Sequence, residues 1–330
     1  MKAVLVSKEE AEIARQRLFS EDALDKTRKL VKKKGFVEIP VKETFATTDF
    51  DLIEQVKPEY YIRNKTLGDI LDITEEEEKF IPSGWQILGD IIILSLKKEI
   101  EHRKAEIGKG LLSLYPRCKT VLLDRGIAGR MRQPEREIIA GKGTETVHKE
   151  NGCLFKLDAM RIMYSRGNLA ERRRMSELGR GETLVDMFAG IGYFSIPMAV
   201  HSKPEKIFAI EINPVAFGYL KENIMLNGVG DIIEPVAGDC SIATPCGIAH
   251  RVIMGYLDAH EYLEYGIRAL LPGGILHYHE AVPEVIERRP FLRLIEAANK
   301  QGRKAKILEM RRIKKYSPGV WHVVVDVVVD

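Results

Sequence analysis

The chain has 330 residues, of which 45% are hydrophobic and 30% charged, and its net charge is only +3. This composition is typical of a soluble globular protein with two or three domains. No apolar stretch approaches the roughly 20 residues of a membrane span, and the N-terminus has no signal-peptide pattern, so we expect a cytoplasmic protein without a membrane partner. The four cysteines stand apart and form no metal-binding motif, which predicts free thiols.

The charges are unevenly distributed along the chain. Residues 287–315 contain 11 Lys and Arg against 3 Glu, and residues 97–150 also carry an excess of positive charge, whereas residues 75–78 are four consecutive Glu. This asymmetry predicts a polyanionic partner bound on one face. A solvated charged surface is the alternative.

The N-terminal half predicts two small domains. Residues 1–62 alternate short apolar strands with a charged helix and predict an α/β domain, and the polar, acidic residues 63–84 predict a linker. Residues 85–160 predict a second, α+β domain. Its expected elements are a strand at 85–96, a basic helix at 97–115, a strand at 119–124, a glycine-rich turn at 125–135, and strands at 137–143 and 146–158.

Residues 161–330 alternate helical patterns with short strands rich in Val and Ile. Five βα repeats followed by two closing strands predict a doubly wound parallel sheet of seven strands with a C-terminal antiparallel hairpin. The last segment, WHVVVDVVVD, is nearly all apolar and predicts a buried central strand. The expected strands are 183–188, 206–212, 233–238, 251–257, 274–282, 305–313 and 321–329.

The first of these strands leads into VDMFAGIGYFS, residues 185–195, where Gly190 and Gly192 stand in a turn before a helix. Glycines there let the backbone approach a ligand at a helix N-terminus. Ser195 occupies the position of the third glycine in a dinucleotide fingerprint, which disfavours an NAD enzyme without excluding it. The segment, with Phe188 and Ala189, resembles the first motif of class I S-adenosylmethionine (SAM) transferases.

Carboxylates end the next two strands of this predicted sheet. Glu211 follows the glycines by about 20 residues, where a carboxylate can bind both ribose hydroxyls of a nucleoside. Asp239, followed by Cys240, stands where SAM enzymes hold the adenine amino group. A helix-capping role is the alternative interpretation of each carboxylate. The glycine turn, Glu211 and Asp239 stand at successive strand ends, and together they favour SAM as the cofactor.

Several strings resemble one known family. TVHKENG (146–152), VDMFAGIGYFS, RVIMGYL (251–257), HYHEAVPE (277–284) and KKYSPGVWHVVVD (314–326) are similar to the wybutosine-pathway tRNA(Phe) (4-demethylwyosine(37)-C7) aminocarboxypropyltransferases. Their sister family is the tRNA (guanine(37)-N1)-methyltransferases. The resemblance covers the whole chain, most strongly 85–330. It implies that residues 1–62 recognise the tRNA elbow, 85–160 the anticodon side, and that 161–330 bind SAM and catalyse.

The choice between the sister families depends on Met254-Gly255-Tyr256. The methyltransferases carry Asn-(Leu/Pro)-Pro there, and a glycine with an aromatic side chain suits a bulkier, tricyclic base. The resemblance therefore implies transfer of the 3-amino-3-carboxypropyl group from SAM to C7 of 4-demethylwyosine in tRNA(Phe), with release of 5′-methylthioadenosine. The presence of residues 1–62, which many archaeal aminocarboxypropyltransferases lack, keeps the methyltransferase alternative open. A non-catalytic tRNA-binding protein is a third possibility, which the intact SAM motifs disfavour.

The resemblance also implies roles for individual residues. Cofactor binding falls to Ser165 and Arg172, although Arg166 stands where the family has Pro and Arg172 could instead contact tRNA phosphates. Arg132, Asn151, Gly255 and Tyr256 are expected to bind the substrate. His148 or Glu150 is expected to help remove the C7 proton, and a structural role at the domain junction is the alternative for Glu150. His277 and His279 should lie on the sheet face opposite Tyr278, with no metal. A monomer is expected, contacting the anticodon stem-loop and elbow of tRNA(Phe).

Overall fold

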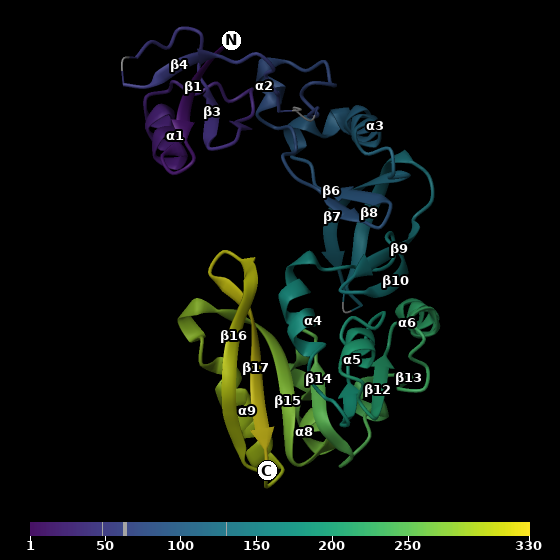
Figure 1. Ribbon diagram of the computed structural model, residues 1–330. Coiled ribbons are helices and arrows are strands. Elements are labelled where there is room, and N and C mark those ends of the chain that lie inside the picture. The colour runs from purple at the N-terminus through teal and green to yellow at the C-terminus, as the bar shows by residue number, and fades with distance from the viewer. Residues whose placement is uncertain (48, 62–64, 130) are drawn as a thin grey trace. The chain divides into compact units, whose positions relative to one another are not determined.

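The computed structural model describes residues 1–47, 49–61, 65–129 and 131–330. The chain forms two compact units, Met1–Thr66 and Leu67–Asp330, and Figure 1 labels most of their helices and strands. The boundary expected between residues 62 and 63 lies outside the described residues.

The first unit is a small sheet covered by one helix. β1 pairs antiparallel with both β3 and β4, and β2 extends the β3 edge. Val4, Leu18 and Ile39 are fully buried between the sheet and α1, as the apolar alternation of the strands requires. The elements are β1 (Lys2–Ser7), α1 (Ala11–Ser20), β2 (Val31–Lys32), β3 (Phe36–Pro40) and β4 (Asp51–Glu54).

The second unit begins in the segment expected to be a linker, and here the structure differs from the expectation for 63–84. Leu67 is buried, and Phe80 and Ile81 pack against the core that contains Leu67 and Leu111. Thr74 caps the short helix α2 (Glu75–Glu78) through a capping box with Glu77. The apolar residues within this acidic segment therefore cover helix α3 instead of leaving a solvated connector.

A four-stranded sheet follows, in the order β5-β6-β7-β8. Residues 85–96, expected as one strand, are two, because Gly89 has a φ of +58° and turns the chain. Most of the expected turn at 125–135 instead extends β7 and β8. The elements are β5 (Gln86–Leu88), β6 (Ile91–Leu94), η1 (Lys98–Arg103), α3 (Lys104–Leu114), β7 (Thr120–Ala128) and β8 (Gln133–Gly141), followed by a hairpin of β9 (Glu145–Glu150) and β10 (Cys153–Asp158).

The large sheet confirms the doubly wound fold. Its order is β13-β12-β11-β14-β15-β17-β16, with the first five strands parallel and β17 antiparallel to both neighbours. β17 is buried between β15 and β16, as its apolar sequence predicted. The strands are β11 (Thr183–Asp186), β12 (Lys206–Glu211), β13 (Ile233–Ala237), β14 (Ala249–Met254), β15 (Leu270–Pro283), β16 (Ala305–Ser317) and β17 (Val320–Val329).

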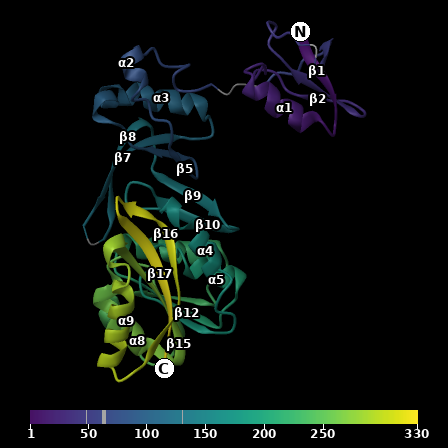
Figure 2. The same ribbon diagram turned by 90° about the vertical axis from the view of Figure 1, so that its left-hand side faces the viewer.

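Helices cover both faces of this sheet. Figure 2 shows α8 and α9 on one side of the β16–β17 hairpin and α4 and α5 on the other. The helical elements are η2 (Arg166–Asn168), α4 (Leu169–Met175), α5 (Ser195–His201), α6 (Pro214–Leu226), α7 (Cys240–Ala243), η3 (Ala259–Tyr262), α8 (Leu263–Ala269), η4 (Glu284–Ile286) and α9 (Arg289–Lys300). Among the described residues, no helix is both long and apolar enough to cross a membrane.

One core joins the parts that were expected to be separate domains at 85–160 and 161–330. Leu88 from β5 and Phe155 from β10 belong to the same buried cluster as Leu184 from β11. Asn223 of α6 and Asn227, which caps the C-terminus of α6, also accept hydrogen bonds from the backbone of β10. The hairpin β9–β10 is therefore held firmly against the sheet that carries the glycine turn.

Candidate active site

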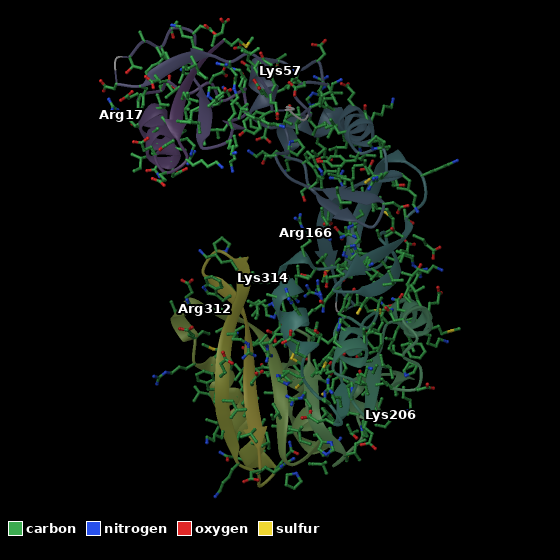
Figure 3. The ribbon with its side chains drawn as sticks, viewed as in Figure 1. Arg17, Lys57, Arg166, Lys206, Arg312 and Lys314 are labelled. Carbon is green, nitrogen blue, oxygen red and sulfur yellow. The ribbon has the colours of Figure 1, made fainter. Side chains whose placement is uncertain are left out.

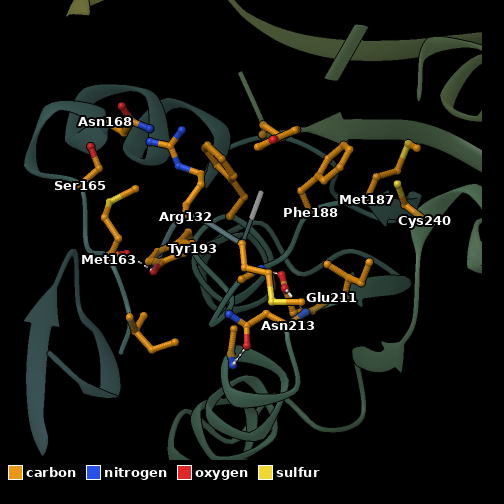
Figure 4. Close-up of a pocket in the computed structure, with 18 of the residues that line it drawn as sticks. Arg132, Met163, Ser165, Asn168, Met187, Phe188, Tyr193, Glu211, Asn213 and Cys240 are labelled. Atoms are coloured by element: carbon orange, nitrogen blue, oxygen red, sulfur yellow. Dashed lines mark hydrogen bonds between the residues drawn. The ribbon is translucent and has the colours of Figure 1, made fainter. Parts of the chain in front are cut away.

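A pocket opens where the parallel strands β11, β12, β13 and β14 end, the usual place for a ligand in such a sheet (Figure 4). It gathers ten of the residues singled out from the sequence. These are Arg132, Ser165, Arg172, Phe188, Gly190, Glu211, Asp239, Cys240, Gly255 and Tyr256.

The glycine turn shapes one wall of the pocket. Gly190 has a φ of +58°, and a Cβ there would lie 2.5 Å from the ring of Tyr193. Gly192 has a φ of +98° and packs against Ile196 and Leu220, so it holds the turn without lining the pocket, as does Ala189. Any larger residue at either glycine would strain the turn.

Asp186 stabilises this turn through hydrogen bonds. Its carboxylate accepts a hydrogen bond from the Ser195 hydroxyl at 2.6 Å and one from the Phe188 N–H at 3.3 Å. Complete burial raises the pKa of Asp186 to about 6. Ser195, the residue that departs from the dinucleotide fingerprint, thus has a structural partner of its own.

Glu211 presents a carboxylate to the pocket from the end of β12. Its two oxygens accept hydrogen bonds from the N–H groups of Gly190 and Asn213, each at 2.7 Å. Burial raises the pKa of Glu211. Because each carboxylate oxygen has a second lone pair, Glu211 can still accept the hydroxyls of a ribose, and the residues present fit a nucleoside.

Asp239 combines the two roles that the sequence left as alternatives. Its Oδ1 accepts hydrogen bonds from the N–H of Ser241 at 2.9 Å and from the Ser241 hydroxyl at 2.8 Å, so it caps α7. It also lines the pocket next to Cys240. Capping orients the carboxylate and does not compete with ligand binding.

Aromatic rings form the wall at the end of β14. Phe188 lies 5.2 Å from Tyr256 and 5.5 Å from Tyr262, measured between ring centroids. A Cβ on Gly255 would come within 2.9 Å of the Phe194 ring. The absence of a side chain at Gly255 therefore makes room for the Phe194 ring. The sequence had instead predicted that Gly255 makes room for a bulky base.

Arg172 is buried at another end of the pocket and is already paired. Its Nε and Nη2 donate to the two oxygens of Glu150 at 2.6 and 2.7 Å, and Nη1 donates to the carbonyl of Ser165 at 3.0 Å. The side chains of Arg172 and Glu150 are 3% and 12% exposed. Glu150 therefore neutralises Arg172 and lies behind the pocket wall, away from the expected position for a base.

His148 and Asn151 also lie outside the pocket, contrary to the expectation for them. Asn151 has a φ of +47° in the turn between β9 and β10, and its amide donates to the Ser176 hydroxyl at 3.2 Å. His148 packs edge-on against Tyr164, and burial lowers its pKa. The Asn-Gly pair at 151–152 is a hairpin-turn signal that could have indicated this structural role.

The pocket also contains residues that the sequence did not single out. Tyr193 donates a hydrogen bond to the Met163 carbonyl at 2.5 Å and so holds the segment that leads to Ser165. Tyr193 lies within the glycine motif, which was the only available signal. The other such residues are Met131, Arg161, Ile162, Met163, Asn168, Met187, Phe194, Ile212, Asn213, Ala216, Gly238 and Tyr262.

Beside the pocket, two buried histidine contacts join β15 to β17. His277 bonds to Asp326 at 2.5 Å, and Nδ1 of His279 lies 3.0 Å from Nε2 of His322. Both His277 and His279 face away from the cluster that contains Tyr278, as predicted. No group of three or more potential metal ligands occurs in the described part of the chain.

Comparison with known proteins finds domains of the two sister families along the chain. Family models match at residues 146–308 (TRM5/TYW2 methyltransferase domain), 67–144 (TYW2 N-terminal domain) and 3–48 (tRNA methyltransferase 5 N-terminal domain).

Two curated relatives illustrate the sister families. The tRNA(Phe) (4-demethylwyosine(37)-C(7)) aminocarboxypropyltransferase of Methanocaldococcus jannaschii is 47% identical over 73% of this chain and 96% of its own length. The tRNA (guanine(37)-N(1))-methyltransferase Trm5b of Pyrococcus abyssi is 36% identical over 98% of both chains. The crystal structure of M. jannaschii TYW2 in complex with AdoMet superposes with a TM-score of 0.63 at 41% identity, covering 75% of this chain and 99% of that one.

Proposed function

Because the chain belongs to the TRM5/TYW2 family, we propose that it is a SAM-dependent tRNA-modifying transferase that moves the 3-amino-3-carboxypropyl group onto C7 of 4-demethylwyosine at position 37 of tRNA(Phe). The leading support is the 47% identity to an archaeal enzyme named for this reaction. The cofactor is SAM, and the alternative of an NAD enzyme falls with the family assignment.

SAM supplies a sulfonium whose γ-carbon is open to attack when the amino-acid tail faces the base. In this proposal Glu211 binds the ribose hydroxyls, and Asp239 with Phe188 holds the adenine. The turn at Gly190 and Gly192 brings the backbone close to the nucleoside. These residues position the donor, and attack by C7 must be in line with the departing sulfur.

The base would enter between the aromatic wall and Arg132. Tyr256 offers a face for stacking, and Arg132 is a cation at the rim that can contact the nucleotide. His148 and Glu150, the candidates for removing the C7 proton, do not line the pocket in this structure. Burial and Asp258 raise the pKa of Tyr256, which keeps its hydroxyl protonated at neutral pH.

One observation favours a second candidate, the tRNA (guanine(37)-N1)-methyltransferase activity. The Trm5b relative covers 98% of the chain, including the first unit, whereas the M. jannaschii aminocarboxypropyltransferase covers 73%. In either enzyme the first unit would recognise the tRNA elbow, and the second unit would bind the anticodon stem-loop. We further propose that the enzyme acts as a cytoplasmic monomer.

The test is a reaction of purified protein with SAM and tRNA(Phe) carrying either guanosine or 4-demethylwyosine at position 37. Mass spectrometry identifies the small product and the modified nucleoside. Formation of 5′-methylthioadenosine only with the tricyclic base is the expected result. S-adenosylhomocysteine formed with guanosine would instead assign the chain to the methyltransferases.

A further inference from the structure

The basic run at residues 287–315 predicted a polyanionic partner, and the structure shows which of its cations are available to one. Four arginines of the run are used within the protein, because their guanidiniums bond to buried carboxylates or to backbone carbonyls. They are Arg289 and Arg293 with Glu280, Arg303 with the carbonyls of Ile267, Leu270, Leu271 and Val329, and Arg311 with Asp326. These four hold α9 and β16 on the sheet, so their charges do not serve a partner.

Two exposed cations of the run lie together near the turn of the β16–β17 hairpin. Arg312 and Lys315 lie over the ring of Trp321, 5.3 and 5.6 Å from its centroid. Arg312 is labelled in Figure 3, near this end of the hairpin. Next to Lys315, Tyr316 is 52% exposed. We call these four residues the hairpin-tip cluster.

The cluster carries positive charge that the protein neutralises only weakly. Among the described residues, no carboxylate forms an ion pair with Lys315. Arg312 donates to one oxygen of Glu287 at 2.7 and 3.0 Å, but the two side chains are 47% and 39% exposed, and water screens such a pair. The indole N–H of Trp321 donates to Glu284 at 2.6 Å, which holds the ring in place beside the two cations. A phosphate can therefore compete with Glu287 for Arg312 and can bind Lys315 directly.

The strand register places this cluster next to the substrate side of the pocket. The loop that carries Tyr256, which lines the pocket, pairs with β15 through a bridge between Asp258 and Glu280. Val282, two residues further along β15, lies opposite Trp321 of β17. Two residues of a strand span about 7 Å. The backbone of a nucleotide whose base enters beside Tyr256 therefore passes close to the cluster.

We propose that the hairpin-tip cluster binds the RNA strand next to the target nucleotide, with Arg312 and Lys315 contacting its phosphates and Tyr316 stacking on an unpaired base. The proposal depends on tRNA being the substrate, as in the proposed function. Phosphate contacts give affinity and position without reading the base sequence. An exposed aromatic ring can in addition hold a base of a single-stranded loop. A base that enters the pocket leaves its backbone outside, and the cluster is placed to receive that backbone.

The variant Lys315→Met removes one charge and keeps much of the length of the side chain. The matched control is Lys306→Met, because Lys306 is an exposed lysine of the same strand, roughly 30 Å away at about 3.3 Å per residue. Filter binding would measure the Kd of each variant for tRNA(Phe) at several salt concentrations. Calorimetry without tRNA would measure the affinity for SAM. Arg312→Met, Tyr316→Ala and Tyr316→Phe would test the other exposed members of the cluster in the same way.

We expect Lys315→Met and Arg312→Met each to weaken tRNA binding by roughly 10-fold, the low end for a hydrogen bond to a charged group. Each should also lower the slope of log Kd against log salt by about 0.7, the value for one phosphate of a single strand. Tyr316→Ala should weaken binding by roughly 10-fold without changing this slope, whereas Tyr316→Phe keeps the ring and should bind like the parent protein. Lys306→Met should also match the parent, and all variants should bind SAM with unchanged affinity.

Parent-like tRNA affinity and salt slope in both Lys315→Met and Arg312→Met would refute the proposal. An equal loss of tRNA affinity in Lys306→Met would refute it as well, because the effect would then come from net charge and not from a site. Weakened SAM binding by the cluster variants would also overturn it, since the cluster would then only support the fold of the pocket.

These outcomes are separate from the identity of the reaction. S-adenosylhomocysteine formed with guanosine would overturn the proposed function, while the selective loss of tRNA affinity in the cluster variants could still be observed. Conversely, 5′-methylthioadenosine formed by the parent protein, together with parent-like tRNA binding by the cluster variants, would overturn the role of the cluster alone.

Discussion

Replacing Glu150 with Gln should destabilise the second unit strongly. The side chains of Arg172 and Glu150 are 3% and 12% exposed, and their two hydrogen bonds are 2.6 and 2.7 Å long. Removing one partner of a buried ion pair costs about 3–5 kcal/mol, because the remaining charge keeps its desolvation penalty. For a unit of this size such a loss lowers Tm by on the order of 10 °C.

Thermal unfolding followed by circular dichroism would measure this change. The matched control is Glu222→Gln, because Glu222 pairs with Lys156 at 2.8 Å while the two side chains are 52% and 37% exposed. That exposed pair should contribute less than about 1 kcal/mol. The double variant Glu150→Met with Arg172→Met should recover much of the stability, since it leaves no unpaired charge. Equal losses for Glu150→Gln and Glu222→Gln would refute the reasoning.

Three further predictions concern the walls of the pocket and the histidine pair beside it. Gly255→Ala should lower the free energy of unfolding in urea by about 1–3 kcal/mol, because the new Cβ meets Phe194, whereas Gly218→Ala in α6, where the space is open, should raise it by about 1 kcal/mol. A neutral result for Gly255→Ala would contradict the contact. Asn213→Ala removes the side-chain cap of α6 and should lower the free energy of unfolding in urea by about 1 kcal/mol, while SAM affinity measured by calorimetry should stay unchanged, because the backbone N–H of residue 213 still donates to Glu211. Burial lowers the pKa of His279 to about 3, so below about pH 6.5 the unfolded chain binds this proton more readily and stability is lost as the pH falls toward 3. His279→Gln should therefore show a smaller drop in Tm between pH 7 and pH 4.5 than the parent protein, and an unchanged drop would show that His279 is not the group involved.

The sequence alone was sufficient for the features that depend on local pattern. The seven strands of the large sheet follow from runs of Val and Ile, and the parallel arrangement of its first five strands follows from the βα repeats. The pocket residues Gly190, Glu211 and Asp239 were found because each ends a parallel strand or lies in the loop that follows one. Such strand ends meet at one edge of the sheet, so their chain positions predict their proximity.

The tertiary structure decided which side chains neutralise one another, since these contacts join residues far apart in the chain. For Glu150 the sequence left a role in the base pocket and a structural role at the domain junction open, and the structure pairs it with Arg172 on a separate element. Lys314 reaches Ser165 across 149 positions, and Gly255 accommodates the ring of Phe194. The sequence predicted a linker at 63–84 because the charges of this segment are visible in the sequence, whereas the packing of its apolar side chains Leu67, Phe80 and Ile81 on a core is not. Charge pairing and close packing depend on distances in space, and no local pattern of residues encodes those distances.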